Sequence, residues 1–188
     1  MAGLALRHFT MDIYEVQKII DDIAGGLERA CVDCMHANER QFKTAVEEQL
    51  YSGLDGEGKH LRPTYDDDPY FDRVRWFHWE DGVMYHGAEG YKIWKRKITP
   101  PEAGALIGLP PRPDAVPNLF IDGTFYQSIM TSQIPEGVRI ETGGDTGKKI
   151  EDKYGSQIFS LSPDAVGWFN RTYMMPAIEN FFKDCGYR

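Results

Sequence analysis

Apolar residues in the first quarter of the chain recur three and four positions apart, the spacing that places side chains on one face of a helix. The pattern predicts a helical part over residues 12–51, formed by two helices or by one helix bent at Gly25 and Gly26, and ended by Gly53. Its apolar positions are Ile13, Val16, Ile20, Ile23, Leu27, Cys31, Cys34, Phe42, Val46 and Leu50.

The pattern changes after this helical part, and it predicts a loop followed by short strands. Residues 52–70 are dense in Gly, Asp and Pro, which favour turns over buried structure. Residues 73–86 are rich in aromatic and β-branched side chains on either side of Glu-Asp-Gly, which predicts a hairpin. Residues 91–98 predict a further strand, and because neither of its faces is cleanly apolar, we expect it at the periphery or at an interface.

Six prolines between Pro100 and Pro117 predict an extended arm over residues 99–117, because proline fixes φ and removes an amide donor. Strands are then predicted at 119–121, 125–132 and 138–142, the last two joined by a Pro-Glu-Gly turn. A helix over 162–185 is predicted to begin at Ser162-Pro163, to kink at Pro176 and to be capped by Gly186. The residues of this helix that are predicted to face the core are Val166, Phe169, Tyr173, Ile178, Phe181 and Cys185.

These elements predict one α+β domain over residues 1–188: N-terminal helices, a loop and strand region at 52–161 with a small, mostly antiparallel sheet and long arms, and a C-terminal helix. The net charge of -8 argues against a surface that neutralises many phosphates. No stretch is long and apolar enough for a membrane span or secretory signal, so we expect a soluble protein made in a cytoplasm. Aromatic residues, at 13%, are numerous and favour protein interfaces.

Two motifs resemble reactive sites but have the wrong spacing. Cys31-x-x-Cys34 has no second ligand pair for zinc and lies on the apolar helix face, which favours core packing, and the three cysteines fit reduced thiols. Residues 143–149, GGDTGKK, enclose three residues between glycines where a phosphate-binding loop has four, which favours a polar turn leading into a short helix. We expect His36 to be solvated.

The acidic loop residues Asp66, Asp67 and Asp68, with Asp55, Glu57 and Asp72 near them in sequence, could gather a structural cation or form a solvated acidic loop. A metal-assisted hydrolase using Asp66, Asp68 and His60 is one alternative function. His78 and His86 flank the predicted hairpin and are expected to be packed or at an interface, and Ser128 lacks the spacing of a nucleophile elbow. We therefore assign no catalytic, cofactor-binding or metal-binding residue and predict a protein that is not an enzyme.

One basic concentration is interleaved with tryptophans, and it allows three interpretations: stacking on single-stranded nucleic acid, contact with an acidic protein partner, or an ordinary salt-bridged surface. Its members are Arg73, Arg75, Lys92, Lys95, Arg96 and Lys97, beside Trp76, Trp79 and Trp94.

Two sequence blocks resemble small structural proteins of tailed-phage prophages typical of Bacteroidetes phages. The first is QLYSGLDGEGKHLRPTY at 49–65, and the second is DGTFYQSI at 122–129 with DTGKKIEDKYGSQIFSLS at 145–162. More distantly, the second block is similar to tail-completion proteins, although the order Asp122-Gly123-Thr124 differs from their Asp-Thr-Gly. The resemblance implies an α+β fold, a ring position between portal and tail, and no cofactor.

We therefore predict a virion structural protein, a head–tail connector of the neck or a tail-completion component, assembled in the bacterial host cytoplasm. Its expected partners are the portal, adjacent connector or tail proteins and further copies of itself in a ring, with no membrane and with contact to packaged DNA left open. The Pro-rich arm, the Gly/Asp-rich loop and the aromatic strands would gain stability from neighbouring subunits. The alternatives are the hydrolase and a monomeric binding module of a prophage.

Overall fold

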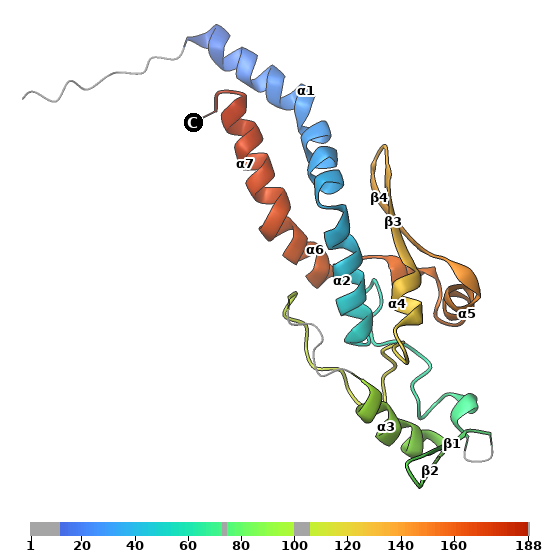
Figure 1. Cartoon of the computed structure of the whole chain (residues 1–188). Helices are drawn as coiled ribbons and strands as arrows, with labels where there is room; N and C mark the ends of the chain where they lie inside the picture. The colour runs from blue at the N-terminus through green and yellow to red at the C-terminus, as the bar shows by residue number, and fades with distance from the viewer. Residues whose placement is uncertain (1–11, 73–74, 100–105, 188) are drawn as a thin grey trace, which may run out of the picture.

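A computed structural model describes residues 12–72, 75–99 and 106–187. The fold is α+β, as predicted, and its strands form two separate two-stranded antiparallel sheets within the described part. The molecule is elongated, with a pair of helices at one end and a small lobe at the other (Figure 1). Between them lies a body built from a helix, a long hairpin and several short helices.

The N-terminal part is helical, and its break falls at Asn38. Helix α1 (Ile13–Ala37) begins with a capping box between Asp12 and Glu15 and continues through the Gly25–Gly26 pair. Helix α2 (Glu39–Tyr51) follows after Asn38, whose side-chain amide donates to the Cys34 carbonyl at 2.9 Å. Of the two predicted alternatives, two helices are confirmed, and an asparagine that satisfies a helix-terminal carbonyl separates them.

The small lobe contains the short helix η1 (Pro69–Phe71), strands β1 (Phe77–Glu80) and β2 (Val83–His86), and helix α3 (Gly87–Ile98). The predicted hairpin is confirmed, with Phe77 opposite His86 and Trp79 opposite Met84. The predicted strand at 91–98 is wrong. Tyr91 and Lys95 are four residues apart and both buried, which is the helical spacing, and a lysine at a core position conceals that spacing in the sequence.

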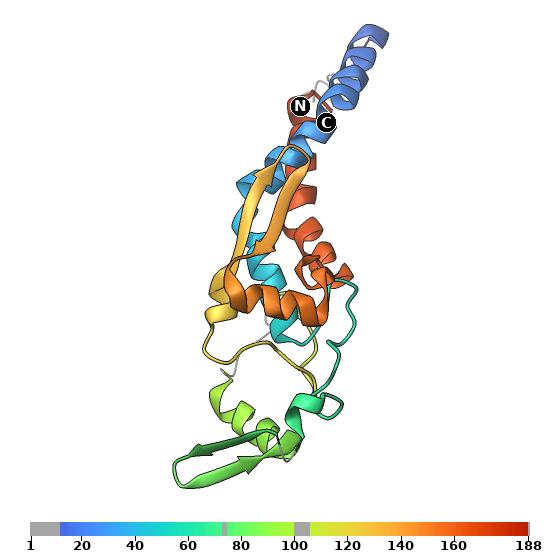
Figure 2. The ribbon, with the colours of Figure 1, turned by 90° about the vertical axis from the view of Figure 1, so that its right-hand side faces the viewer.

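The second hairpin consists of β3 (Ile129–Ile134) and β4 (Gly137–Thr142), and it runs beside helices α1 and α2 (Figure 2). Strand 138–142 and the Pro-Glu-Gly turn agree with the sequence prediction. Residues 119–121 are irregular instead of a strand, and the first part of the predicted strand 125–132 is helix α4 (Thr124–Ser128). The Asp122 carboxylate accepts the Thr124 amide at 2.9 Å, which favours a helical start over an extended chain.

After β4 come α5 (Gly144–Tyr154), η2 (Ser156–Phe159), α6 (Pro163–Phe169), the π-helical turn η3 (Asn170–Met174) and α7 (Met175–Asp184). A short helix is present as predicted, but residues 144–149 already belong to it and do not form a turn before it. Ser162 caps α6 through the Ala165 amide. The π-helical turn interrupts the C-terminal helix just before Pro176, near the predicted kink. Val166, predicted to face the core, is 41% exposed instead.

Three apolar clusters hold these elements together. The largest joins α2 to α4, β3 and η2, and the second joins α2 to α6. The third is the aromatic core of the small lobe, formed by Tyr65, Phe71 and Tyr91. The described part of the predicted arm, residues 106–117, packs on its own chain: Leu109 and Val116 are buried, and the Tyr65 amide donates to the Ala115 carbonyl at 2.8 Å. The arm's first residues, 100–105, lie outside the described ranges.

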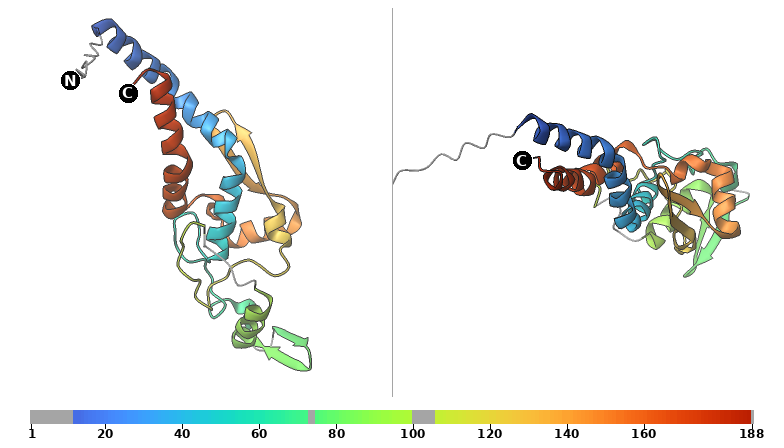
Figure 3. Two further views of the ribbon diagram at one scale, coloured as in Figure 1. Left: turned by 60° about the vertical axis from the view of Figure 1, so that its left-hand side comes forward. Right: turned by 90° about the horizontal axis from the view of Figure 1, so that it is seen from above.

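Helices α1 and α7 run antiparallel, so the start of α1 and the end of α7 lie at the same tip (Figure 3). A side chain at Gly26 would overlap the ring of Phe181, which fixes where the two helices meet. Gly186, with φ +97°, ends the helix as predicted and approaches Ile19. None of the helices in the described ranges is long and apolar enough to cross a bilayer.

Candidate functional site

The two sequence blocks that carry the phage resemblance pack directly on each other. Gln49, fully buried at the end of α2, donates to the Ser160 carbonyl and accepts the Ser162 amide, both at 2.7 Å. Beside it, the Gly56 amide donates to the Gln157 carbonyl at 3.0 Å. The buried amide is thus bonded through both its oxygen and its nitrogen, and it joins segments more than a hundred residues apart.

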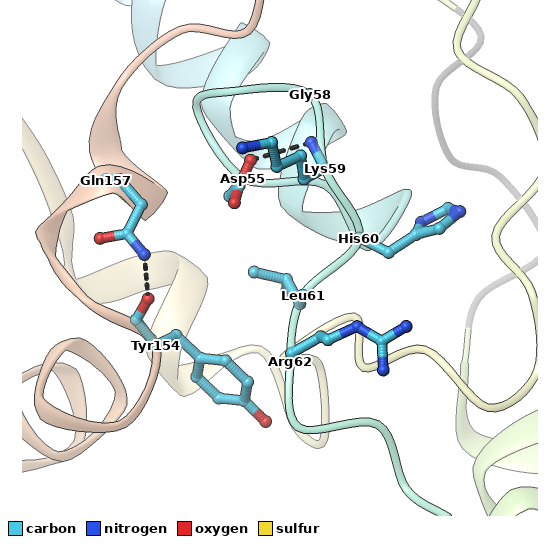
Figure 4. Close-up of a pocket in the computed structure, with 8 residues that line it drawn as sticks. All are labelled: Asp55, Gly58, Lys59, His60, Leu61, Arg62, Tyr154 and Gln157. Carbon is cyan, nitrogen blue, oxygen red and sulfur yellow. Dashed lines mark hydrogen bonds between the residues drawn. The ribbon is translucent and has the colours of Figure 1, made fainter. Parts of the chain in front are cut away.

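An open hollow of about 560 Å³ lies where these blocks meet (Figure 4). The Asp55 carboxylate accepts the Glu57 and Lys59 amides at 2.9 Å, and the Gln157 amide donates to the Tyr154 carbonyl at 2.7 Å. These polar groups are therefore engaged in holding the loops. The lining residues are Asp55, Gly58, Lys59, His60, Leu61, Arg62, Tyr154 and Gln157.

The aspartate triplet does not converge on one point. Asp66 pairs with Lys92 at 2.8 Å, Asp67 with Arg62 at 3.2 Å, and Asp68 with Lys153. Each carboxylate thus has a separate cation, and His60 is exposed, six residues before Asp66 in the same connection. Across the described ranges, no three His, Cys, Asp or Glu side chains lie close enough to hold a metal ion. The geometry required for the hydrolase with Asp66, Asp68 and His60 is not formed.

The cysteines and two of the histidines have packing or structural contacts. Cys34 is buried, and its thiol lies 3.6 Å from the Tyr173 carbonyl, whereas Cys31 is half-buried. His36, expected to be solvated, instead places Nε2 3.0 Å from the carbonyls of both Ile134 and Gly137, so it anchors the tip of the long hairpin to α1. His78 packs against the ring of Trp94.

The outer face of the β1–β2 hairpin is apolar and exposed. Directly opposite residues of an antiparallel pair share a face, so Phe77, Trp79, Met84 and His86 lie together. Phe77 is 64% exposed and Trp79 is 62% exposed. We call these four residues the hairpin face. Soluble monomers rarely leave such adjacent aromatic side chains uncovered, so the hairpin face is the strongest candidate for a contact with another protein.

Several residues of the basic concentration form contacts within the chain. Lys92 pairs with Asp66 and Glu89, Arg96 pairs with Asp114 at 3.1 Å, and Lys97 lies over the ring of Tyr85. These contacts favour the interpretation of a salt-bridged surface for Lys92 and Arg96. Arg73 lies outside the described ranges.

Lys95 differs from Lys92, Arg96 and Lys97. Its side chain is buried, with only 1% of the residue exposed, and its Nζ has no hydrogen-bond partner within the described part of the chain. The Nζ lies 5.7 Å from the centre of the Phe120 ring. Burial, with a smaller contribution from the positive charge of Arg112, lowers the pKa of Lys95 from 10.5 to about 7.

The hairpin face could have been found from the sequence, since aromatic residues alternate at Phe77 and Trp79 on a correctly predicted strand. The burial of Lys95 could not have been found in this way, because a lysine in a basic run is expected at the surface.

Comparisons with protein-family models, curated proteins and solved structures found no match.

Proposed function

We propose that this protein is a virion structural component of a tailed phage, a head–tail connector of the neck or a tail-completion protein. It assembles as a ring through contacts between copies and with the portal or adjacent connector and tail proteins, and it performs no chemistry. The observation that carries the proposal is the hairpin face, which places Phe77 and Trp79 in solvent at one end of an elongated molecule.

Two further features support the proposal. The helical pair at the other end also exposes apolar side chains, among them Ile13 and Ile20. Exposed apolar surfaces at opposite ends suit the heterologous contacts that close a ring, in which each copy presents a different surface to each neighbour. The blocks that resemble phage structural proteins also form one continuous packed region around Gln49.

Phage particles test the position of the protein. We expect it to co-purify with particles that encode it and to occupy a symmetric layer at the neck in an electron cryomicroscopy reconstruction. Particles that lack the protein, or that carry it outside the neck and tail, would refute the proposal.

Substitution of the hairpin face tests the contact itself. A buried aromatic anchor at an interface contributes about 2 kcal/mol or more, so Trp79→Ser should abolish incorporation into particles while the free chain keeps its melting temperature. Ile121→Ser is the matched control, because Ile121 is similarly exposed, at 56%, but lies outside the hairpin face. Equal incorporation of both variants would show that the hairpin face is not the contact.

A further inference from the structure

Buried hydrogen-bond donors without acceptors lie where α3 meets residues 112–120, which connect the small lobe back to the body (Figure 1). Lys95 is 1% exposed and Asn118 is 0% exposed, and in the described part of the chain neither Lys95 Nζ nor Asn118 Nδ2 has a hydrogen-bond partner. The Thr99 hydroxyl, one helical turn after Lys95, is likewise buried without a partner there. Buried polar groups in folded proteins are almost always bonded, so these three groups require acceptors that the described residues do not provide.

The ring of Phe120 relates the donors of the two elements to each other. Lys95 Nζ, from α3, lies 5.7 Å from the centre of this ring. Asn118 Oδ1 accepts the Phe120 amide at 3.2 Å, which leaves Nδ2 as the donor without a partner. The Tyr126 hydroxyl donates to the Asn118 carbonyl at 2.5 Å and so fixes this residue from the body side. Phe120 therefore adjoins the ammonium of one element and the amide of the other.

Two positive charges in this region have no carboxylate partner among the described residues. The Arg112 guanidinium donates to the carbonyls of Pro113, at 3.1 Å, and Val116. These neutral acceptors hold the guanidinium in place but do not offset its charge. Arg112 is close enough to Lys95 for its charge to add to the effect of burial in lowering the pKa of the amine. Two neighbouring cations in a partly buried region are costly without an anion.

The chemistry of these groups selects a small oxyanion. An ammonium, an amide N–H and a hydroxyl all donate to the oxygens of a carboxylate or a phosphate. An apolar ligand would leave the donors unpaired, and a metal cation would be repelled by the two positive charges. Because Lys95 and Asn118 are almost fully buried, the ligand must be small enough to be enclosed, as inorganic phosphate and acetate are.

We propose that this junction binds a small oxyanion that accepts hydrogen bonds from Lys95, Thr99 and Asn118. Its charge offsets the positive charges of Lys95 and Arg112. The anion joins the small lobe to the body, because Lys95 and Thr99 lie at the end of α3 whereas Asn118 follows Val116, a member of the largest apolar cluster. The inference is independent of the proposed function, since it concerns the stability of each single copy.

Thermal unfolding of the full chain in inorganic phosphate or acetate tests the site, with sodium chloride bringing every sample to the same ionic strength. A ligand that binds only the folded state raises the melting temperature as its concentration rises. We expect at least one of the two anions, at about 50 mM, to raise the melting temperature of wild type by about 4 °C or more. Lys95→Met should lose this rise, whereas Lys149→Met, at an exposed position of α5, should keep it.

Two further variants separate the site from other effects. Asn118→Asp keeps the acceptor for the Phe120 amide and supplies a carboxylate of its own, so it should no longer respond to the added anion. Glu102 lies outside the described ranges, and Glu102→Gln should respond as wild type does. A rise that appears only in Glu102→Gln would show that the chain supplies its own acceptor and would overturn the inference.

Nuclear magnetic resonance of protein labelled with ¹³C at the lysine Cε atoms provides a second readout. The Lys95 signal is the one that Lys95→Met lacks. In chloride its titration should have a midpoint at about 7, and added phosphate or acetate should raise this midpoint, because a bound anion favours the charged ammonium. A water molecule bonded to the same donors would give no such rise. An unchanged midpoint, no rise in melting temperature beyond that in chloride, or an equal rise in Lys95→Met would overturn the inference.

Discussion

Replacing Lys95 with methionine should stabilise the fold, although it removes a charged residue from a basic segment. The ammonium group lies between α3 and the ring of Phe120, beside Arg112, and has no hydrogen-bond partner within the described ranges. Methionine preserves much of the aliphatic length and needs no partner. The variant therefore keeps the packing between the small lobe and the body and removes the cost of a buried charge.

The size of the effect follows from the pKa of Lys95, which falls from 10.5 in the unfolded chain to about 7 in the fold. A difference of about 3.5 units corresponds to about 5 kcal/mol, an upper value because the unfolded reference is idealised. Below pH 7 both states hold the proton, and the whole cost is present. Between pH 7 and 10.5 the unfolded state binds more protons, so wild-type stability rises by up to about 1.4 kcal/mol per pH unit from this group.

Urea unfolding at several values between pH 6 and 9 measures the effect. We expect the free energy of unfolding of Lys95→Met to exceed that of wild type by about 5 kcal/mol at pH 6 and by about 2 kcal/mol at pH 9. Lys149→Met, at an exposed position of α5, should match wild type at every pH. An advantage that does not change with pH, or a variant less stable than wild type, would show that Lys95 remains charged and compensated in the fold.

Three further predictions concern buried contacts. Gln49→Leu leaves two backbone groups of segment 160–162 without their partner and should lower the free energy of unfolding by about 2–4 kcal/mol, measured in urea. Gly56→Ala places a Cβ 2.5 Å from the Gln157 carbonyl oxygen and should lower the melting temperature by several degrees, whereas Gly82→Ala, with open space around it, tests the strain of its positive φ alone. Cys34 should react with a thiol reagent more slowly than the other two cysteines, because burial shields it and raises its pKa.

The parts of the fold that follow from local patterns were predictable. The capped start of the last helix at Ser162 and the β1–β2 hairpin each depend on a few neighbouring residues, and both agree with the structure. The sequence predicts two helices but not a break at Asn38, because the adjacent Gly25 and Gly26 are stronger helix breakers. Inside α1, a Cβ at Gly26 would come 2.8 Å from the tip of the Phe181 ring, a contact with a distant residue that the local pattern does not show.

The same distinction between local patterns and distant contacts applies to the candidate sites. The separation of Asp66 from Asp68 depends on Lys92 and Lys153, which approach from other elements and cannot be paired with them from the sequence. The described part of the Pro-rich segment packs against its own chain because Val116 and Pro117 are buried there, a contact that composition does not predict. Strand alternation places Phe77 and Trp79 on one face once the hairpin is known, but their exposure depends on the small lobe packing against the other face.

The shared tip of α1 and α7 has a mechanical consequence. If the chain is pulled from residues 19 and 186, the force separates the two helices starting at their shared tip. The contacts of the helical pair then break one after another, whereas loading in shear would strain all of them together. We expect the two helices to separate at low force while the body, closed by Gln49, is still intact. The chain would then lengthen in two distinct steps.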